Sequence, residues 1–308
     1  MYNLAAIVGP TAVGKTGISI KVAQLLNAEI LSCDSMQVYR GMDIGTAKAG
    51  VEERSVVPHH LIDMVAIDQD FSVAEYQKEA KKVIAEVNER GKLPLLVGGT
   101  GLYYQSVVDD YDFVPMESRR EVRERLNKAA EQKGLPFLFK YLESLDPLYA
   151  AKISSNDQKR IIRALEVYEL TGETFSVQQN KAENTYNLAT VGLYLDREAL
   201  YSRINMRVEQ MFKDGLLEEV RALREQGYEL DLNAMQALGY KQAYYYLEGF
   251  INWDDMADEI KRETRRYAKR QYTWFRKDKR IHWVNVDEYP NDNDLAQKIS
   301  SFIGRTIL

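Results

Sequence analysis

The strongest constraint in this sequence is a glycine-rich segment, Gly9-Pro10-Thr11-Ala12-Val13-Gly14-Lys15-Thr16. An apolar run at residues 4–8 precedes it, and a helical pattern at residues 18–26 follows it. A glycine, four residues and then Gly-Lys-Thr, placed between a strand and a helix, is the pattern of a phosphate-binding loop. The segment therefore predicts a strand, a loop and a helix that together bind a di- or triphosphate.

Each residue type in this loop has a chemical role. Gly9 and Gly14 let the backbone wrap around a phosphate with its N–H groups turned inward, and the positive end of the following helix dipole points to the same place. Lys15 supplies a full positive charge for the outer phosphate, and the Thr16 hydroxyl is placed to hold a magnesium ion. The alternative is a glycine-rich turn that binds nothing, which the Lys-Thr pair disfavours.

Composition limits the class of protein. With 308 residues, of which 45% are hydrophobic, the chain can bury a large core, as one large domain with an elaboration or as two. No apolar run approaches the ~20 residues that cross a bilayer and no secretion signal is evident, so we expect a cytosolic protein. Cys33 is the only cysteine, which excludes an intrachain disulfide, and the histidines lack a zinc spacing, so the expected metal is magnesium.

The charge is distributed unevenly. The net charge is −5, yet residues 261–280 contain ten Lys or Arg against two acids. Such a contrast suits a selective polyanion site better than general adhesion to nucleic acid. In a helix over residues 261–277 the cations form one stripe, whereas Tyr267, Trp274 and the apolar residues form another face, so we assign these two aromatic residues to packing.

Two further strands are predicted to end at the phosphate loop. Residues 28–33 read as a strand followed by Asp34, and residues 93–97 as a buried strand followed by a glycine-rich turn that contains Thr100. In open α/β sheets, ligands bind beyond the carboxyl ends of the strands. Asp34 is therefore a candidate general base or magnesium ligand, with a role as a helix cap or turn residue as the alternative.

The chain is predicted to be an α/β protein with a helical insertion. Residues 117–170 contain no convincing strand and instead suggest helices at 117–133, 137–145 and 157–170, whereas a strand resumes at 188–195. We therefore expect a parallel-sheet core flanked by helices, formed by residues 1–111 and 188–308, and an all-helical domain at 112–187. From the residues alone, a solvated surface is the favoured interpretation of the charged insertion helices.

A phosphate loop alone serves kinases, hydrolases and switches. A switch is disfavoured because the chain contains no Asp-x-x-Gly segment. The residues leave open a transferase that moves a group from a diphosphate to a nucleic acid, a small-molecule kinase that uses ATP, and a nucleic-acid-binding module. The last would make Asp34 unnecessary.

Several segments together resemble one family. They are the phosphate loop, residues 34–48, Pro58-His59-His60, residues 96–103, Arg163-Ala164-Leu165-Glu166-Val167 and residues 267–274. In this order they are similar to the tRNA dimethylallyltransferases, also called tRNA isopentenyltransferases, of the bacterial type without a C-terminal zinc finger. The resemblance implies a P-loop NTPase-like core with a helical insertion that contacts tRNA.

The resemblance also implies an activity. Members transfer the dimethylallyl group from dimethylallyl diphosphate to the exocyclic amine of the adenosine immediately 3′ of the anticodon, releasing pyrophosphate. Lys15 and Mg²⁺ on Thr16 would neutralise the leaving diphosphate, Asp34 would take the proton of the amine, Thr100 would position the nucleotide, and Arg203 would hold the diphosphate. Arg207 lies one helical turn from Arg203, and the sequence does not rank the two.

The family's tRNA contacts carry over to matching positions. They are Asp34, Ser35, Met36, Gln37, Thr100, Arg123, Gln158, Lys159, Arg160, Ile161, Ile162, Gly239, Tyr240 and Lys241. The anticodon stem-loop is thus the expected partner, with the target base extruded toward Asp34. The cationic stripe is predicted to clamp phosphates, so that Arg265→Ala lowers affinity without changing which base is modified.

Overall fold

The computed structural model describes residues 1–111, 113, 119–178 and 185–307. Contacts divide the chain into two compact units, which are Met1–Val108 with Asn184–Leu308, and Asp109–Glu183. The boundaries expected from the sequence were 112, which lies outside the described residues, and 187. Each unit is described below by itself.

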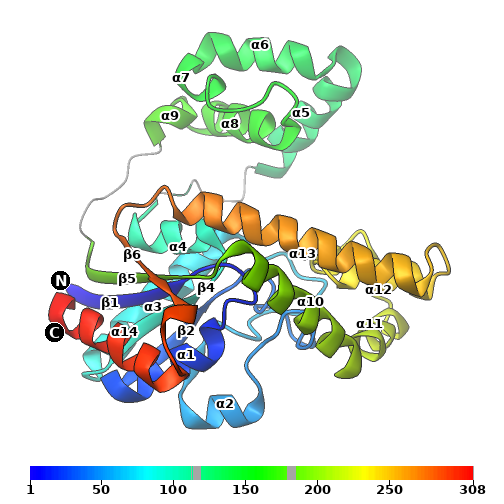
Figure 1. The fold of residues 1–308 in the computed structure, drawn as a ribbon. Helices are drawn as coiled ribbons and strands as arrows, with labels where there is room; N and C mark the ends of the chain where they lie inside the picture. Colours follow the sequence, from blue (N-terminus) through cyan, green and yellow to red (C-terminus); the bar gives the residue numbers. More distant parts are fainter. Residues whose placement is uncertain (112, 114–118, 179–184, 308) are drawn as a thin grey trace. The chain divides into compact units, whose positions relative to one another are not determined.

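The first unit is built on one parallel sheet (Figure 1). Among the described residues the strand order is β3-β2-β4-β1-β5-β6, and every neighbouring pair is parallel. The strands are β1 (Tyr2–Val8), β2 (Ala28–Cys33), β3 (His59–His60), β4 (Leu93–Gly98), β5 (Tyr186–Tyr194) and β6 (Ile281–Asn285). Because all strands run the same way, the carboxyl ends of β1, β2 and β4 lie at one edge, where ligands bind in such sheets.

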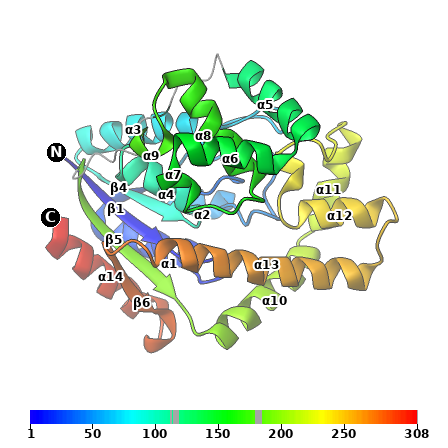
Figure 2. The same cartoon turned by 90° about the horizontal axis from the view of Figure 1, so that it is seen from above.

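Alternation along β1 shows how the sheet is covered on both faces. Leu4, Ala6 and Val8 belong to one apolar cluster, and Ala5 and Ile7 to another. The second cluster includes helices α1 (Lys15–Leu26) and α14 (Asp292–Ile307), which lie side by side, whereas α3 (Val73–Glu89) and α4 (Gly101–Val108) cover the first (Figures 1 and 2). The continuous apolar strands therefore reflect burial on both faces.

The remaining helices of this unit pack around the edge where the strands end. They are α2 (Val51–Val56), α10 (Arg197–Lys213), α11 (Leu216–Glu225), α12 (Tyr240–Leu247) and α13 (Trp253–Phe275), with short 3₁₀ turns at Ala234–Gln236 and Val286–Glu288. Asn252 caps α13 by accepting the backbone N–H of Asp255. The helix therefore starts eight residues before the basic segment from which it was predicted, because its acidic first turn carries no cationic stripe.

The second unit is helical, as expected for an insertion. Its helices are α5 (Arg119–Lys133), α6 (Leu135–Leu145), α7 (Pro147–Ala150), α8 (Gln158–Thr171) and α9 (Phe175–Gln178). Leu126, Leu142 and Leu165 belong to its own buried cluster. The Asp157 carboxylate accepts the N–H of Arg160, so Asp157 caps α8.

The helices that the structure describes include none with the length and apolarity that a membrane span requires.

Candidate active site

The phosphate loop adopts the geometry that its glycines allow. Gly9 has φ +151° and Gly14 has φ +98°, and a Cβ at Gly9 would lie 2.6 Å from the backbone oxygen of Leu193. A side chain at Gly9 would therefore displace the neighbouring strand. The loop ends in α1, whose N-terminus supplies unpaired N–H groups and a positive dipole.

Lys15 lies folded back over this loop. Its ammonium donates hydrogen bonds to the carbonyl oxygens of Gly9 at 3.0 Å and Pro10 at 2.7 Å. The pKa of Lys15 is lowered to about 7, chiefly by burial and also by the positive charge of Arg207, while the Asp34 carboxylate opposes the shift. A bound anion at this position would restore the full charge of the lysine.

The ends of β2 and β4 are joined by hydrogen bonds. The backbone N–H of Ser35 donates to the Thr100 hydroxyl at 3.1 Å, and the N–H of Thr100 donates to the Cys33 carbonyl at 3.1 Å. One Asp34 carboxylate oxygen accepts the N–H of Met36 at 2.9 Å. The carboxylate is thereby held on a short turn that is anchored to the neighbouring strand.

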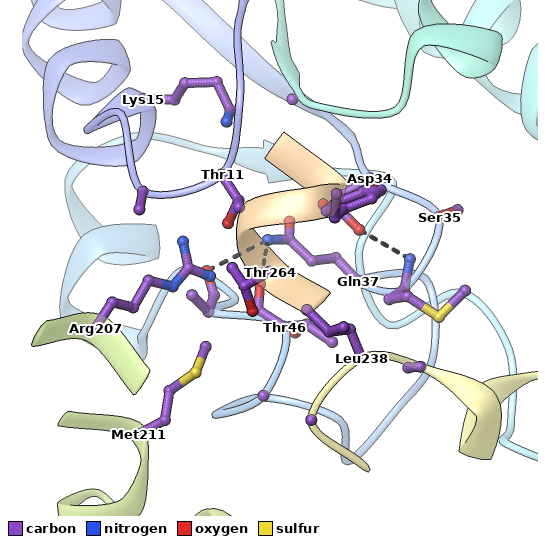
Figure 3. Close-up of a pocket in the computed structure, with 18 of the residues that line it drawn as sticks. Thr11, Lys15, Asp34, Ser35, Gln37, Thr46, Arg207, Met211, Leu238 and Thr264 are labelled. Atoms are coloured by element: carbon purple, nitrogen blue, oxygen red, sulfur yellow. Dashed lines mark hydrogen bonds between the residues drawn. The ribbon is translucent and has the colours of Figure 1, made fainter. Parts of the chain in front are cut away.

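These segments line a single cavity of about 860 Å³ at the carboxyl edge of the sheet. Lys15 enters from the phosphate loop, Arg207 from α10 and Asp34 from the end of β2 (Figure 3). Such a volume is typical of a small-molecule site. The cavity therefore brings Lys15, Arg207 and Asp34 to the same space.

The structure distinguishes the two arginines of α10. Arg203 lines the cavity but forms an ion pair with Asp287 at 3.0 Å, and 38% of its side chain is exposed. Arg207 also lines the cavity, and no residue that the structure describes forms an ion pair or hydrogen bond with it. Burial lowers the pKa of Arg207, and the Asp34 carboxylate opposes this shift. A bound anion would give this guanidinium the partner that it lacks among the described residues.

Most other residues predicted for the phosphate loop, the β2 turn and the start of α12 also line this cavity. They are Thr11, Ala12, Gly14, Thr16, Ser35, Met36, Gln37, Gly239 and Lys241. Gly9, Pro10 and Val13 instead form the wall of the loop, with Val13 in the apolar core. Thr100 does not line the cavity, since its hydroxyl holds the Ser35 backbone.

Three of the residues predicted to contact tRNA have buried side chains. Ile161 and Ile162 are 0% and 4% exposed in the core of the helical unit, and Tyr240 is 0% exposed. Tyr240 donates its hydroxyl to Glu219, and a Cβ at Gly45 would lie 2.3 Å from its ring. In the structure these three side chains therefore contribute to packing beneath the surface.

The other predicted residues of the helical unit remain accessible. Gln158, Lys159 and Arg160 are exposed on the first turn of α8. Arg123 is exposed as well, and its guanidinium forms an ion pair with the buried Glu166 at 3.1 Å. Exposed polar side chains at these positions fit contacts with a polyanion.

On α13 the structure corrects the predicted stripe. Arg265 donates a hydrogen bond to Asn205 at 2.8 Å and lies over the Tyr201 ring, so it joins α13 to α10 and is not free for phosphate. Tyr267, assigned from the sequence to packing, lines the cavity. Burial raises its pKa and Asp34 adds to the shift. Helical periodicity could not identify this tyrosine, because core and cavity residues share the same spacing.

The donors for a metal ion are few and are oxygens. The Thr16 hydroxyl and the Asp34 carboxylate line the cavity, and among the described residues no three His, Cys, Asp or Glu side chains cluster as a metal site. Mg²⁺ retains several waters and is commonly held by one or two protein oxygens together with substrate phosphates. The residues therefore fit a magnesium ion that arrives with a phosphate substrate, and they do not fit a stand-alone metal centre.

Together the fold and the cavity define a P-loop enzyme that handles a phosphate-bearing substrate beside a carboxylate. The family model described as IPP transferase matches residues 37–278. The chain belongs to this family, so the resemblance read from the motifs is confirmed.

Three known proteins illustrate the similarity. A tRNA dimethylallyltransferase from Syntrophomonas wolfei is 61% identical over 303 residues, which cover 98% of each chain. The structure of a tRNA isopentenylpyrophosphate transferase from Bacillus halodurans superposes with a TM-score of 0.75 at 43% identity, covering 100% of this chain and 97% of that one. A eukaryotic dimethylallyltransferase acting on tRNA superposes with a TM-score of 0.81 at 28% identity, covering 100% of this chain and 78% of that one.

Proposed function

We propose that this protein transfers the dimethylallyl group of dimethylallyl diphosphate to the exocyclic amine of the adenosine immediately 3′ of the anticodon in tRNA, with release of pyrophosphate. The observation that carries the proposal is that the phosphate loop and the Asp34 carboxylate line the same cavity. The names of the similar proteins support tRNA as the acceptor.

The first requirement of the reaction is a stabilised leaving group. As the allylic C–O bond breaks, negative charge accumulates on the departing diphosphate, and preorganised positive groups lower the energy of that state. The N–H groups at the start of α1, the Lys15 ammonium and the Arg207 guanidinium converge on this cavity. Arg203 is placed to assist from the same face of α10.

The second requirement is removal of a proton from the acceptor. An aromatic amine is a weak nucleophile, so a base that takes its proton as the C–N bond forms raises the rate. Asp34 is in place for this role, because its turn is tied to Thr100 and its carboxylate lines the cavity. The target adenosine must leave the base stack to reach it.

A magnesium ion fits the same picture. The Thr16 hydroxyl would hold the ion, which would supply additional positive charge toward the leaving group when the diphosphate is bound. Within the described part of the chain the Thr16 hydroxyl has no hydrogen-bond partner, and it lines the cavity beside Lys15.

The anticodon stem-loop is the proposed macromolecular substrate. On the helical unit, Arg123, Gln158, Lys159 and Arg160 offer exposed polar side chains to RNA phosphates and bases. On the core unit, Gly239 and Lys241 line the cavity, where an extruded nucleotide would enter.

A transfer assay tests the proposed function. The pure protein is incubated with Mg²⁺, unmodified tRNA and dimethylallyl diphosphate that carries a label in the prenyl group. Label in the RNA, mapped to the base 3′ of the anticodon, supports the proposal. Turnover of ATP to ADP without labelled RNA would support the kinase alternative, and a tRNA gel shift without product would indicate a binding module.

The shifted pKa of Lys15 predicts uptake of protons on binding. In the free protein burial lowers this pKa to about 7, so at pH 8 the amine is mainly neutral. A bound diphosphate favours the charged form, and binding at pH 8 should take up about one proton per site. Affinity should therefore decline as the pH rises above 7. Calorimetry in two buffers of different ionisation enthalpy, without tRNA, measures this uptake.

A matched variant controls this experiment. Lys15→Arg remains charged at every pH used and should show no uptake at pH 8. If the unmodified protein took up no protons, Lys15 would not become protonated on binding the diphosphate, which would contradict this prediction.

The corrected surface of α13 predicts which cations clamp RNA. Lys269 and Arg270 are exposed, so Lys269→Ala or Arg270→Ala should weaken tRNA binding several-fold and reduce the slope of log affinity against log salt by about one. Arg265→Ala should leave that slope unchanged and instead lower the melting temperature, since it removes the bond to Asn205. Filter binding across a salt series distinguishes the two classes. If the slope of log affinity against log salt were the same in all variants, these cations of α13 would not contact RNA phosphates.

A further inference from the structure

A single buried side chain links the two glycine-rich turns of the core. The Gln271 side chain is 5% exposed and extends from α13 toward both turns. Its carbonyl oxygen accepts the backbone N–H of Thr11 at 2.9 Å, and its amide donates to the Gly99 carbonyl at 2.9 Å. Both ends of one amide are therefore satisfied by two different loops.

One of these loops would bind the diphosphate, and the other holds the turn that bears Asp34. Thr11 belongs to the phosphate loop, which would hold the leaving diphosphate. Gly99 precedes Thr100, whose hydroxyl accepts the N–H of Ser35 at 3.1 Å, directly beside Asp34. The phosphate loop is thus connected to the turn that bears the carboxylate by the two hydrogen bonds of Gln271, the Gly99-Thr100 backbone and the hydrogen bond from Ser35 to Thr100.

The approach of Gln271 is close enough to require glycine beneath it. A Cβ at Gly99 would lie 2.2 Å from the Gln271 amide nitrogen, a distance that no real contact permits. Gln271 also lines the cavity, so it is part of the wall between the phosphate loop and Asp34. The backbone N–H of Thr11 is occupied by its hydrogen bond to Gln271, so it holds the shape of the loop and is not a donor to the ligand.

From these contacts we infer that Gln271 is a positioning residue, which sets the separation between the diphosphate in the phosphate loop and the Asp34 carboxylate. This inference rests on the proposed transfer reaction. It assigns Gln271 no contact with substrate: its effect on rate passes through the alignment of Asp34. A displacement of about 1 Å between reacting groups can cost as much as about 10²-fold in rate.

The test uses single-turnover transfer from labelled dimethylallyl diphosphate to tRNA, with both substrates saturating. Gln271→Leu and Gln271→Glu should each lower the rate about 10- to 30-fold. Gln271→Glu keeps the size and the acceptor for Thr11 but replaces the N–H for Gly99 with a negative charge, whereas Gln271→Leu removes both bonds without adding charge. Binding of dimethylallyl diphosphate should change much less than the rate, because the remaining loop N–H groups and Lys15 stay in place.

A matched variant separates positioning from stability. Gln77 is also a buried glutamine, whose amide donates to the Ser106 carbonyl at 2.7 Å away from the cavity. Gln77→Leu should lower the melting temperature without lowering the rate. A rate loss of equal size in this variant would overturn the inference.

A double mutant supplies the sharper readout. In an Asp34→Asn background, Gln271→Leu should lower the remaining rate by less than about threefold, because there is no base left to align. A full 10- to 30-fold loss in that background would show that Gln271 acts independently of Asp34 and would overturn the inference. If the unmodified protein itself transfers no label, the proposed function fails, whereas normal transfer with unaffected Gln271 variants refutes only the positioning role.

Discussion

Replacing Asp34 with asparagine is expected to lower the transfer rate by about 10²–10⁴-fold, the usual contribution of a general base. Asparagine keeps the size of the side chain and an oxygen that can accept the Met36 N–H, so the turn after β2 should persist. It cannot take the proton of the attacking amine. Single-turnover transfer at saturating tRNA and dimethylallyl diphosphate measures the loss, with little change expected in the affinity for either substrate.

The control is an aspartate outside the cavity. Asp68 is exposed and does not line the site, so Asp68→Asn should retain the full rate. If the Asp34→Asn variant worked as fast as the unmodified protein, the carboxylate would have no part in proton removal.

The second large effect is expected at Arg207. Removal of one preorganised donor from a site of developing negative charge costs about 10²–10³-fold in rate, and Arg207→Ala should lower kcat/KM for dimethylallyl diphosphate by that amount. Arg203→Ala should cost about tenfold, because the Asp287 carboxylate already neutralises Arg203 in part. Steady-state kinetics with tRNA held saturating compares the two variants.

Stability provides a check on this interpretation. Arg207 is a half-buried cation without a partner among the described residues, so its removal should not lower the melting temperature of the free protein. Arg207→Lys keeps the charge but not the planar fork, and should lie between the alanine variant and the unmodified protein in rate. A greater loss at Arg203 than at Arg207 would reverse the assignment of the diphosphate ligand.

Sequence reasoning succeeded where structure depends on neighbouring residues. The phosphate loop was predicted because its glycines, Lys15 and Thr16 are adjacent in the chain, and α1 begins at Lys15 as expected. The ends of β2 and β4 were located by short apolar runs followed by turn residues, and parallel strands necessarily bring such ends to one edge.

Sequence reasoning failed where the outcome depends on which face of a helix meets a partner. Ile161 and Ile162 match a family segment that contacts RNA, yet the first turn of α8 directs them into the core of the helical unit. On α13, Arg265 and Lys269 share one cationic stripe in the sequence, but α10 packs against the former and leaves the latter exposed. The 3.6-residue period predicts which residues share one face of a helix, but not which segment packs against that face.

By itself, the amino-acid sequence determined the parallel core, the phosphate loop, the position of Asp34 at the end of the second strand and the helical nature of the insertion. Only the tertiary structure decided that Arg207 lacks a partner among the described residues while Arg203 has Asp287, that Tyr267 lines the cavity, and that Gln271 bridges two turns that lie 260 and 172 residues before it in the chain. The reason is physical: local conformation follows from adjacent residues, whereas burial and hydrogen-bond partners follow from contacts between segments far apart in the chain.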